Sequence, residues 1–218
     1  MKLTTQQEAM IALNENALLR GERPMQQIFL SSVLGGCFIS WGATMYFTLA
    51  GGSQAALSAL AGPGFHRVVT AGIFPIGLTA ITITGTDMIT SNMMFSSLTF
   101  VSRDSRRTTE QKVAATLRLA VISTAGNLVG ALGMAYFASH LLAASPEATA
   151  FVTAAVVNKA NLPLSVAFFK AVGCNWLVNL AVFQAQTSRS TAGKMAVLWL
   201  PITTVRRAGP LLLLVVCR

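Results

Sequence analysis

A long stretch without charge is the feature that most constrains how this chain can fold. Residues 24–65 contain no Asp, Glu, Lys or Arg, and their densest apolar part, 28–50, is long enough to cross a bilayer once. Of the 218 residues, 53% are hydrophobic and only 11% are charged, whereas soluble domains carry about 25% charged residues. The sequence therefore predicts an all-α membrane protein whose main partner is the lipid bilayer.

Further apolar segments predict about five spans in one transport domain. The predicted spans are 28–50, 68–101, 117–142, 171–186 and a fifth that begins at residue 195. Glycines and a proline within 51–64 predict an external loop, and the intermediate polarity of 148–170 predicts a re-entrant or surface helix. Gly126, Gly130 and Gly133 in the third span predict close packing against another helix. We divide the chain into an N-terminal segment (1–27), a transmembrane domain (28–205) and a C-terminal tail (206–218).

The distribution of basic residues predicts the orientation. Most Lys and Arg residues lie in the N-terminal segment, in 102–118 and in 187–194, whereas Arg67, Lys159 and Lys170 fall on the opposite side of the alternating spans. The positive-inside rule then places the N-terminus in the cytoplasm, and we expect a multi-pass protein of the plasma membrane. Beyond Pro201 this pattern fails, because Arg206-Arg207 interrupts an apolar stretch too short to cross the bilayer.

An acidic interruption divides the second span. Gly85-Thr86-Asp87 separates two apolar pieces, and the backbone groups freed by such a break cannot be left in lipid. We therefore expect the break to line a watery cavity, with the positive end of the next half-helix turned towards an anion. The alternative is that Asp87 or Thr90 only caps the first turn of that helix.

Paired interruptions give a second indication of transport. Phe74-Pro75 and Leu200-Pro201 are Pro-interrupted apolar segments, and Gly36-Cys37 and Gly173-Cys174 occupy corresponding places. Such pairs are typical of inverted-repeat transport folds, although coincidence is an alternative.

Other classes of function find no support in the residues. The cysteines Cys37, Cys174 and Cys217 lie in apolar surroundings without metal-type spacing, which argues against a disulfide framework or a metal site. No nucleophile–base pair or phosphate-binding loop is present, so we expect neither an enzyme nor a cofactor. The net charge of +9 is spread between apolar runs, which argues against a nucleic-acid partner.

Four runs of residues resemble the formate/nitrite transporter family. Residues 71–78 and 85–92 are similar to that family's second helix and its interrupting loop, and Gly126-Asn127 with Gly130 resembles its third helix. The run Gly173-Cys174-Asn175-Trp176-Leu177-Val178 resembles its fourth-segment signature. The resemblance covers about residues 24–205. It implies an aquaporin-like bundle of six helices per subunit, here with about five spans, assembled as a homo-pentamer with one pore for formate or nitrite in each subunit.

The resemblance also implies which residues form the pore. Phe74, Leu78, Met88 and Ile89 fall at its apolar constrictions, Thr90 at the polar loop position, and Lys159 and Asn175 at its lysine and asparagine. A lysine near a vestibule concentrates anions and favours proton uptake by a weak acid, which then crosses in its neutral form. From the residues alone, Lys159 also suits a snorkelling role, Asn175 an inter-helix hydrogen bond, and Phe74 and Leu78 ordinary packing.

The resemblance ends near residue 205. In the family a second break carries a phenylalanine and a pore histidine, but Val205 and Leu212 fall at those positions here, and no sixth helix follows. We interpret this end as a shifted reading frame or mis-spliced product. The alternative is a genuine variant in which Arg206 or Arg207 supplies positive charge. The corresponding alternative function is a truncated, transport-inactive membrane protein that associates with or modifies complete subunits.

Overall fold

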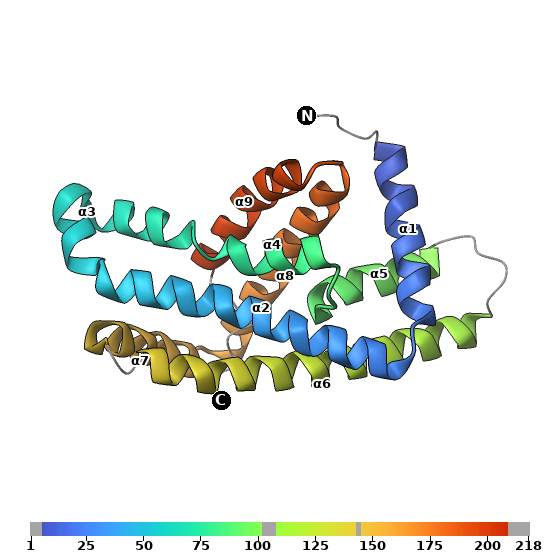
Figure 1. Ribbon diagram of the computed structural model, residues 1–218, viewed down its shortest axis with the longest axis horizontal. Coiled ribbons are helices and arrows are strands. Elements are labelled where there is room, and N and C mark those ends of the chain that lie inside the picture. Colours follow the sequence, from blue (N-terminus) through green and yellow to red (C-terminus); the bar gives the residue numbers. More distant parts are fainter. Residues whose placement is uncertain (1–5, 102–107, 143–144, 209–218) are drawn as a thin grey trace.

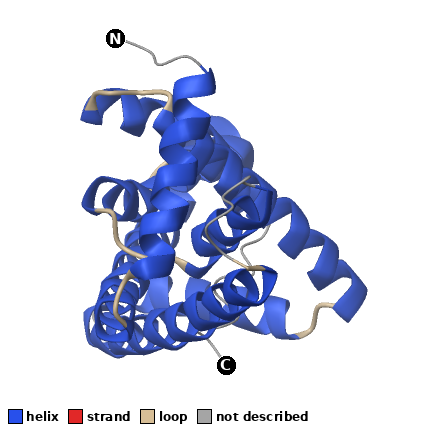
Figure 2. Ribbon diagram, turned by 90° about the vertical axis from the view of Figure 1, so that its right-hand side faces the viewer, coloured by secondary structure: helices blue, strands red, loops and turns tan. Residues whose placement is uncertain are grey.

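The computed structural model describes residues 6–101, 108–142 and 145–208, and Figure 2 shows helices and connecting loops throughout this part of the chain. This confirms the all-α prediction. The helices, in chain order, are α1 (Gln6–Glu22), α2 (Met25–Gly52), α3 (Gln54–Ala71), α4 (Pro75–Thr84), α5 (Ile89–Val101), α6 (Thr109–Leu142), α7 (Pro146–Ala160), α8 (Leu164–Gln186) and α9 (Thr191–Ala208).

Helices α2 and α6 run side by side along the longest axis of the molecule (Figure 1). Their backbones touch because glycines lie at the contact: a Cβ atom on Gly130 would lie 1.9 Å from the carbonyl oxygen of Val33, and one on Gly126 would lie 2.7 Å from that of Phe29. The predicted small-residue contact is therefore confirmed at these two glycines. It is wrong for Gly133, where an added Cβ would have no neighbour within 4 Å among the described residues.

Four helical stretches in the described residues are long and apolar enough to cross a membrane: Met25–Gly52, Gln54–Thr84, Thr109–Leu141 and Leu164–Gln186. We expected about five spans, but α9 is not among these four. Helices α6 and α8 begin earlier than predicted, at Thr109 and Leu164. The first turn of α6 is polar and so falls outside the apolar pattern, whereas α8 begins with mainly apolar residues that Lys170 separates from the predicted span.

The predicted external loop over 51–64 is wrong. Only Ser53 separates α2 from α3, and the helical path bends at Ala61 and Gly62, where Gly62 adopts φ +83°. Residues 55–60 are mainly Ala and Leu, which favour helix, so the helical conformation is lost only at the kink formed by Ala61 and Gly62. The segment 148–170 holds a separate helix, α7, and the start of α8, with Pro163 at the junction.

Helix α9 continues past the point where the sequence pattern fails. It contains Pro201 and runs to Ala208, so the backbone stays helical through residues 206 and 207, where the apolar stretch ends. The first three residues of the predicted C-terminal tail thus belong to this helix. Leu212 lies outside the described residues.

Candidate functional site at the break between α4 and α5

The break in the second span lies where the sequence predicts it. Helix α4 ends at Thr84, Gly85 follows in the left-handed conformation (φ +70°, ψ 19°), and α5 begins at Ile89. Only glycine adopts this conformation without strain, so Gly85 permits the chain to leave the helix. Gly85 is exposed, Thr86 is buried, and Asp87 and Met88 are almost completely covered.

The buried carboxylate of Asp87 pairs with two arginines that come from the start of the chain. Asp87 has 0% of its surface exposed. Its Oδ1 accepts a hydrogen bond from Nη1 of Arg20, and its Oδ2 accepts one from Nη1 of Arg23 at 3.0 Å. Both carboxylate oxygens thus bond to guanidinium groups. Asp87 therefore does more than cap α5, which was the alternative.

Arg20 fixes helix α1 to the break. Besides Asp87, its guanidinium donates to Oδ1 of Asn92 at 3.1 Å and to the carbonyl oxygen of Gly85 at 3.4 Å. The guanidinium carbon also lies 4.6 Å from the ring centre of Phe95, a cation–π distance. Burial lowers the pKa of Arg20 below its usual value while the Asp87 charge opposes this. An arginine nevertheless stays protonated at neutral pH, so the pair is ionic.

Asn127 of α6 satisfies the backbone groups that the break leaves free. Its Oδ1 accepts the Ile89 N–H at 2.8 Å, and its Nδ2 donates to the carbonyl oxygens of Asp87, at 2.9 Å, and Ser32. The Asp87 N–H in turn donates to Oγ of Ser31 at 3.0 Å. The cap of α5 is thus a side chain from another helix. Side chains of α2 and α6 hold the break open, as a lipid-embedded interruption requires.

Helix α2 also supports the break through its backbone. A Cβ atom on Gly35 would lie 2.3 Å from the carbonyl oxygen of Asp87. The absence of a side chain at Gly35 therefore lets the break pack directly against α2.

Three of the four predicted constriction residues belong to one buried apolar cluster. Phe74, Leu78 and Met88 are buried in one apolar cluster that also contains Cys174 and Val178 of α8. Ile89 is half-buried and lies outside this cluster. The predicted polar position, Thr90, is buried, and its Oγ1 has no hydrogen-bond partner among the described residues. An orphaned hydroxyl of this kind is a place for water or a small polar ligand.

The two remaining predicted residues lie on other helices. Lys159 is half-buried in the last turn of α7. Asn175 is half-buried on α8, and its Nδ2 donates to the carbonyl oxygen of Ala171 in the same helix at 3.1 Å, so this bond does not join two helices.

Sequence reasoning missed Arg20, Arg23 and the capping role of Asn127. A signal was present in each case, since an acid inside a span requires a positive partner and an asparagine inside a span requires hydrogen bonds. Neither signal names the partner, because Arg20 and Asp87 lie 67 positions apart in the sequence.

Replacing Asn127 with Ala is expected to destabilise the protein by about 1–3 kcal/mol, because the Ile89 N–H and two carbonyl groups lose their partner. The measurement is the free energy of unfolding in mixed detergent micelles. Asn16→Ala is the matched control, since among the described residues the Asn16 side chain bonds only to Ala12 of its own helix, and its effect should stay within about 0.5 kcal/mol. Equal losses in the two variants would contradict the capping role.

Comparisons of the sequence give one consistent answer. The family described as "Formate/nitrite transporter" matches residues 7–209. A probable formate transporter from Methanothermobacter thermautotrophicus is 31% identical over 204 residues, which cover 85% of this chain and 70% of that protein. The nitrite transporter NirC of Escherichia coli (strain K12) is 30% identical over 175 residues, covering 78% of this chain and 59% of that protein. Each alignment thus covers a smaller share of the relative's length than of this chain's length.

Solved structures agree with the fold. A structure titled as a pentameric formate channel with formate bound superposes with a TM-score of 0.74 at 22% identity, covering 88% of this chain and 73% of that chain. A structure titled as an FNT family ion channel superposes with a TM-score of 0.71 at 27% identity, covering 94% of this chain and 76% of that chain. The fold of this chain is the fold of those channels.

Proposed function

The chain belongs to the formate/nitrite transporter family, and from this premise we propose that it is a channel-type transporter subunit for small monovalent anions such as formate or nitrite. The protein is an integral membrane protein with several apolar helices. The observation that carries the proposal is the broken second span, because its freed backbone is bonded by Asn127 and Ser31 and its flanks meet in an apolar cluster. A break held in this way is typical of a transport path through lipid.

The apolar residues at the break suit a constriction. Phe74, Leu78 and Met88 belong to one buried cluster. Ile89, the first residue of α5, follows Met88 directly. An apolar constriction excludes a hydrated anion but admits a small neutral acid, because only the charged form pays a large desolvation cost. We therefore infer that formate or nitrite crosses together with a proton.

The polar residues suit the approaches to that constriction. The Thr90 hydroxyl has no partner among the described residues, which leaves it available to the permeating molecule. Lys159 brings a positive charge and Asn175 an amide that hydrogen-bonds only locally. A lysine at a vestibule raises the local anion concentration and promotes proton transfer to the anion.

We further propose that five copies of the chain assemble, each with its own pore, in the plasma membrane with the N-terminus in the cytoplasm. The support for five copies is the likeness to a pentameric formate channel. The support for the orientation is the excess of Lys and Arg at the N-terminus and in two loops on the same side.

Uptake into proteoliposomes tests the proposed function. Purified protein containing only this polypeptide is reconstituted, and the uptake of labelled formate and of labelled nitrite is followed with an inward proton gradient and without one. Flux above that of empty vesicles, faster with the gradient, is expected. Flux equal to that of empty vesicles in both conditions would refute the proposal and leave a transport-inactive membrane protein that associates with complete subunits.

Lys159→Gln is expected to lower the initial rate of formate uptake roughly tenfold, because the variant removes the charge that concentrates the anion. The reduction should shrink as ionic strength rises, since screening weakens steering in the parent protein as well. Lys194→Gln is the matched control with the same loss of charge at the start of α9. A similar reduction in both variants would mean that net charge, and not Lys159, sets the rate.

A further inference from the structure

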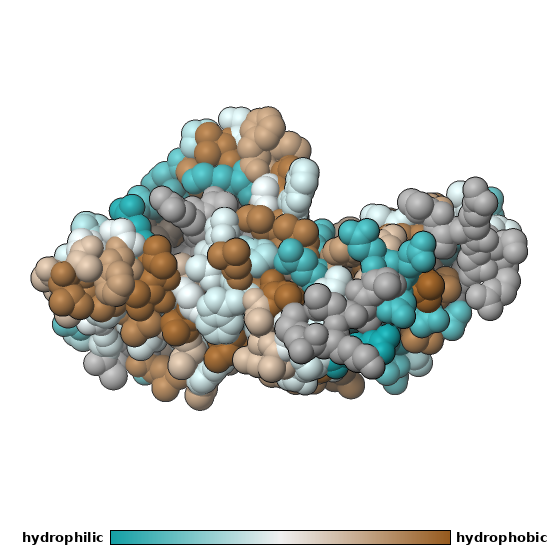
Figure 3. All heavy atoms as spheres, turned by 90° about the horizontal axis from the view of Figure 1, so that it is seen from above, coloured by the Kyte–Doolittle hydropathy of each residue, from teal (hydrophilic) through white to brown (hydrophobic). Residues whose placement is uncertain are grey.

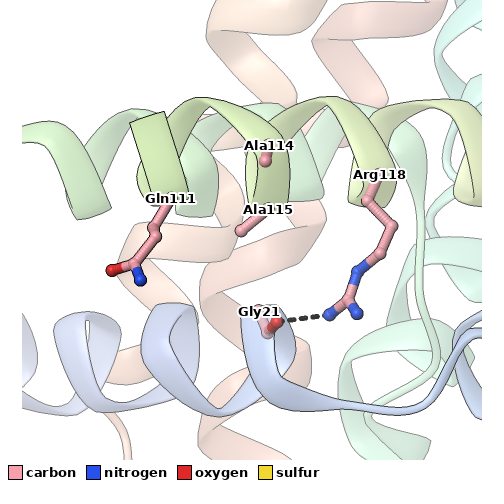
Figure 4. Close-up of a pocket in the computed structure, with 5 residues that line it drawn as sticks. All are labelled: Gly21, Gln111, Ala114, Ala115 and Arg118. Carbon is pink, nitrogen blue, oxygen red and sulfur yellow. Dashed lines mark hydrogen bonds between the residues drawn. The ribbon is translucent and has the colours of Figure 1, made fainter. Parts of the chain in front are cut away.

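A second polar site lies where the end of α1 meets the first turns of α6. A cavity of about 390 Å³ opens there, lined by Gly21, Gln111, Ala114, Ala115 and Arg118. Figure 4 shows Arg118 and Gln111 extending from α6 towards the backbone of α1, with the small side chains of Ala114 and Ala115 between them. The alanines leave the space that forms the cavity.

Arg118 brings a positive charge to this cavity that is only partly satisfied. Its Nη2 donates to the carbonyl oxygens of Gly21 and, at 3.3 Å, Arg23, which are groups at the C-terminal end of α1. Its second amino group, Nη1, makes no hydrogen bond with the described residues. Two carbonyl dipoles do not neutralise a guanidinium, so an anion at Nη1 would complete its coordination.

The cavity lies at the level where the chain enters the membrane. Arg23 is the last charged residue before the charge-free stretch of α2, and Arg118 is the last before the charge-free stretch 119–142 of α6. With 34 residues, α6 is about 51 Å long, whereas the hydrocarbon core is about 30 Å thick. Its first turns therefore extend into the layer of lipid headgroups. In the view of Figure 3, hydrophilic residues gather at this same end of the molecule.

An exposed apolar stripe on α6 runs beside the cavity. Val113, Leu117 and Val121 are 41%, 59% and 67% exposed and follow one another at four-residue spacing. Helix geometry places Leu117 and Val121 next to Ala114 and Arg118 on the helix surface. An acyl chain along this stripe would leave its phosphate within reach of Arg118.

We propose that the cavity between α1 and α6 binds the phosphate of an anionic phospholipid, with one acyl chain against the stripe of Val113, Leu117 and Val121. Three arginines converge at this end of α1. Arg20 and Arg23 pair with Asp87, whereas Arg118 donates to a backbone carbonyl group. Basic pockets between helices at the membrane surface suit such headgroups. The proposal is independent of transport.

Thermal unfolding in detergent tests this site on the full chain. Phosphatidylglycerol is expected to raise Tm by about 2–4 °C relative to phosphatidylcholine with the same acyl chains. Arg118→Gln should abolish this difference. Ala114→Leu should abolish it too while keeping the charge and the bonds of Arg118 to α1, because the larger side chain fills the cavity. Arg189→Gln, which removes an exposed arginine paired with Glu8, should retain the difference.

Three outcomes would overturn the proposal. The first is an equal effect of the two lipids on the parent protein. The second is a phosphatidylglycerol effect that persists in Ala114→Leu, which would place the lipid elsewhere even if Arg118→Gln unfolds. The third is an equal rise with inorganic phosphate alone, which would make the cavity a site for soluble phosphate.

Discussion

Asp87→Asn is expected to lower the free energy of unfolding by about 3–5 kcal/mol, because it leaves the buried guanidinium of Arg20 without its counter-charge. A buried charge without a partner costs several kcal/mol, and Arg20 cannot reach water without undocking α1. We expect α1 to separate from the break, which can be measured by faster proteolysis near Arg20 together with a lower unfolding midpoint in detergent.

A double-mutant cycle separates the ion pair from a general effect of mutation. Arg20→Met with Asp87→Asn should cost less than the sum of the two single variants, because the second substitution removes the stranded charge. The exposed pair of Arg189 and Glu8, at 3.4 Å, is the control, and breaking it should cost no more than about 1 kcal/mol. Additive losses at Arg20 and Asp87 would contradict the pairing.

Gly130→Ala is expected to destabilise the protein by about 1–3 kcal/mol or more, because the new methyl group would lie 1.9 Å from the Val33 carbonyl oxygen. The methyl carbon is attached directly to the backbone of α6, and the carbonyl oxygen belongs to the backbone of α2. Neither atom can turn away, so the two helices must move apart. The effect can be followed by unfolding in detergent and by loss of transport, since the same helices hold Asn127 and Ser31 at the break.

The control for this prediction lies one turn further along α6. Gly133→Ala adds a methyl group with no neighbour within 4 Å, and the higher helix propensity of alanine should leave stability unchanged or raise it by up to about 1 kcal/mol. The two variants differ only in what faces the methyl group. Similar losses in both would show that α2 and α6 do not touch as described.

The sequence predicts the break well because its signals are local. Gly85 supports a left-handed turn and Asp87 cannot remain in lipid, so the position of the interruption follows from neighbouring residues. The loop predicted over 51–64 fails for the converse reason. Glycine and proline mark a change of direction, but the helical residues between them decide whether the chain unwinds or bends, and here it bends at Gly62.

The partners of the break could not be predicted, because they depend on the packing of distant segments. Nothing local distinguishes Arg20 and Arg23 from the other basic residues near the first span. The partner of Asp87 is decided by the packing of α1 against α5, where Arg20 also contacts the Phe95 ring and donates a hydrogen bond to Asn92. Similarly, Asn127 reads as a polar residue in an apolar helix, and its role appears only when α6 lies beside the start of α5.

The ion pair between α1 and the break also orders events during biogenesis. Arg20 leaves the ribosome 67 residues before Asp87, so it cannot form this ion pair while α2, α3 and α4 enter the membrane. It must wait in the aqueous phase until the first residues of α5 arrive. The earliest segment to be translated therefore reaches its final place only after α2, α3 and α4, once the start of α5 has arrived.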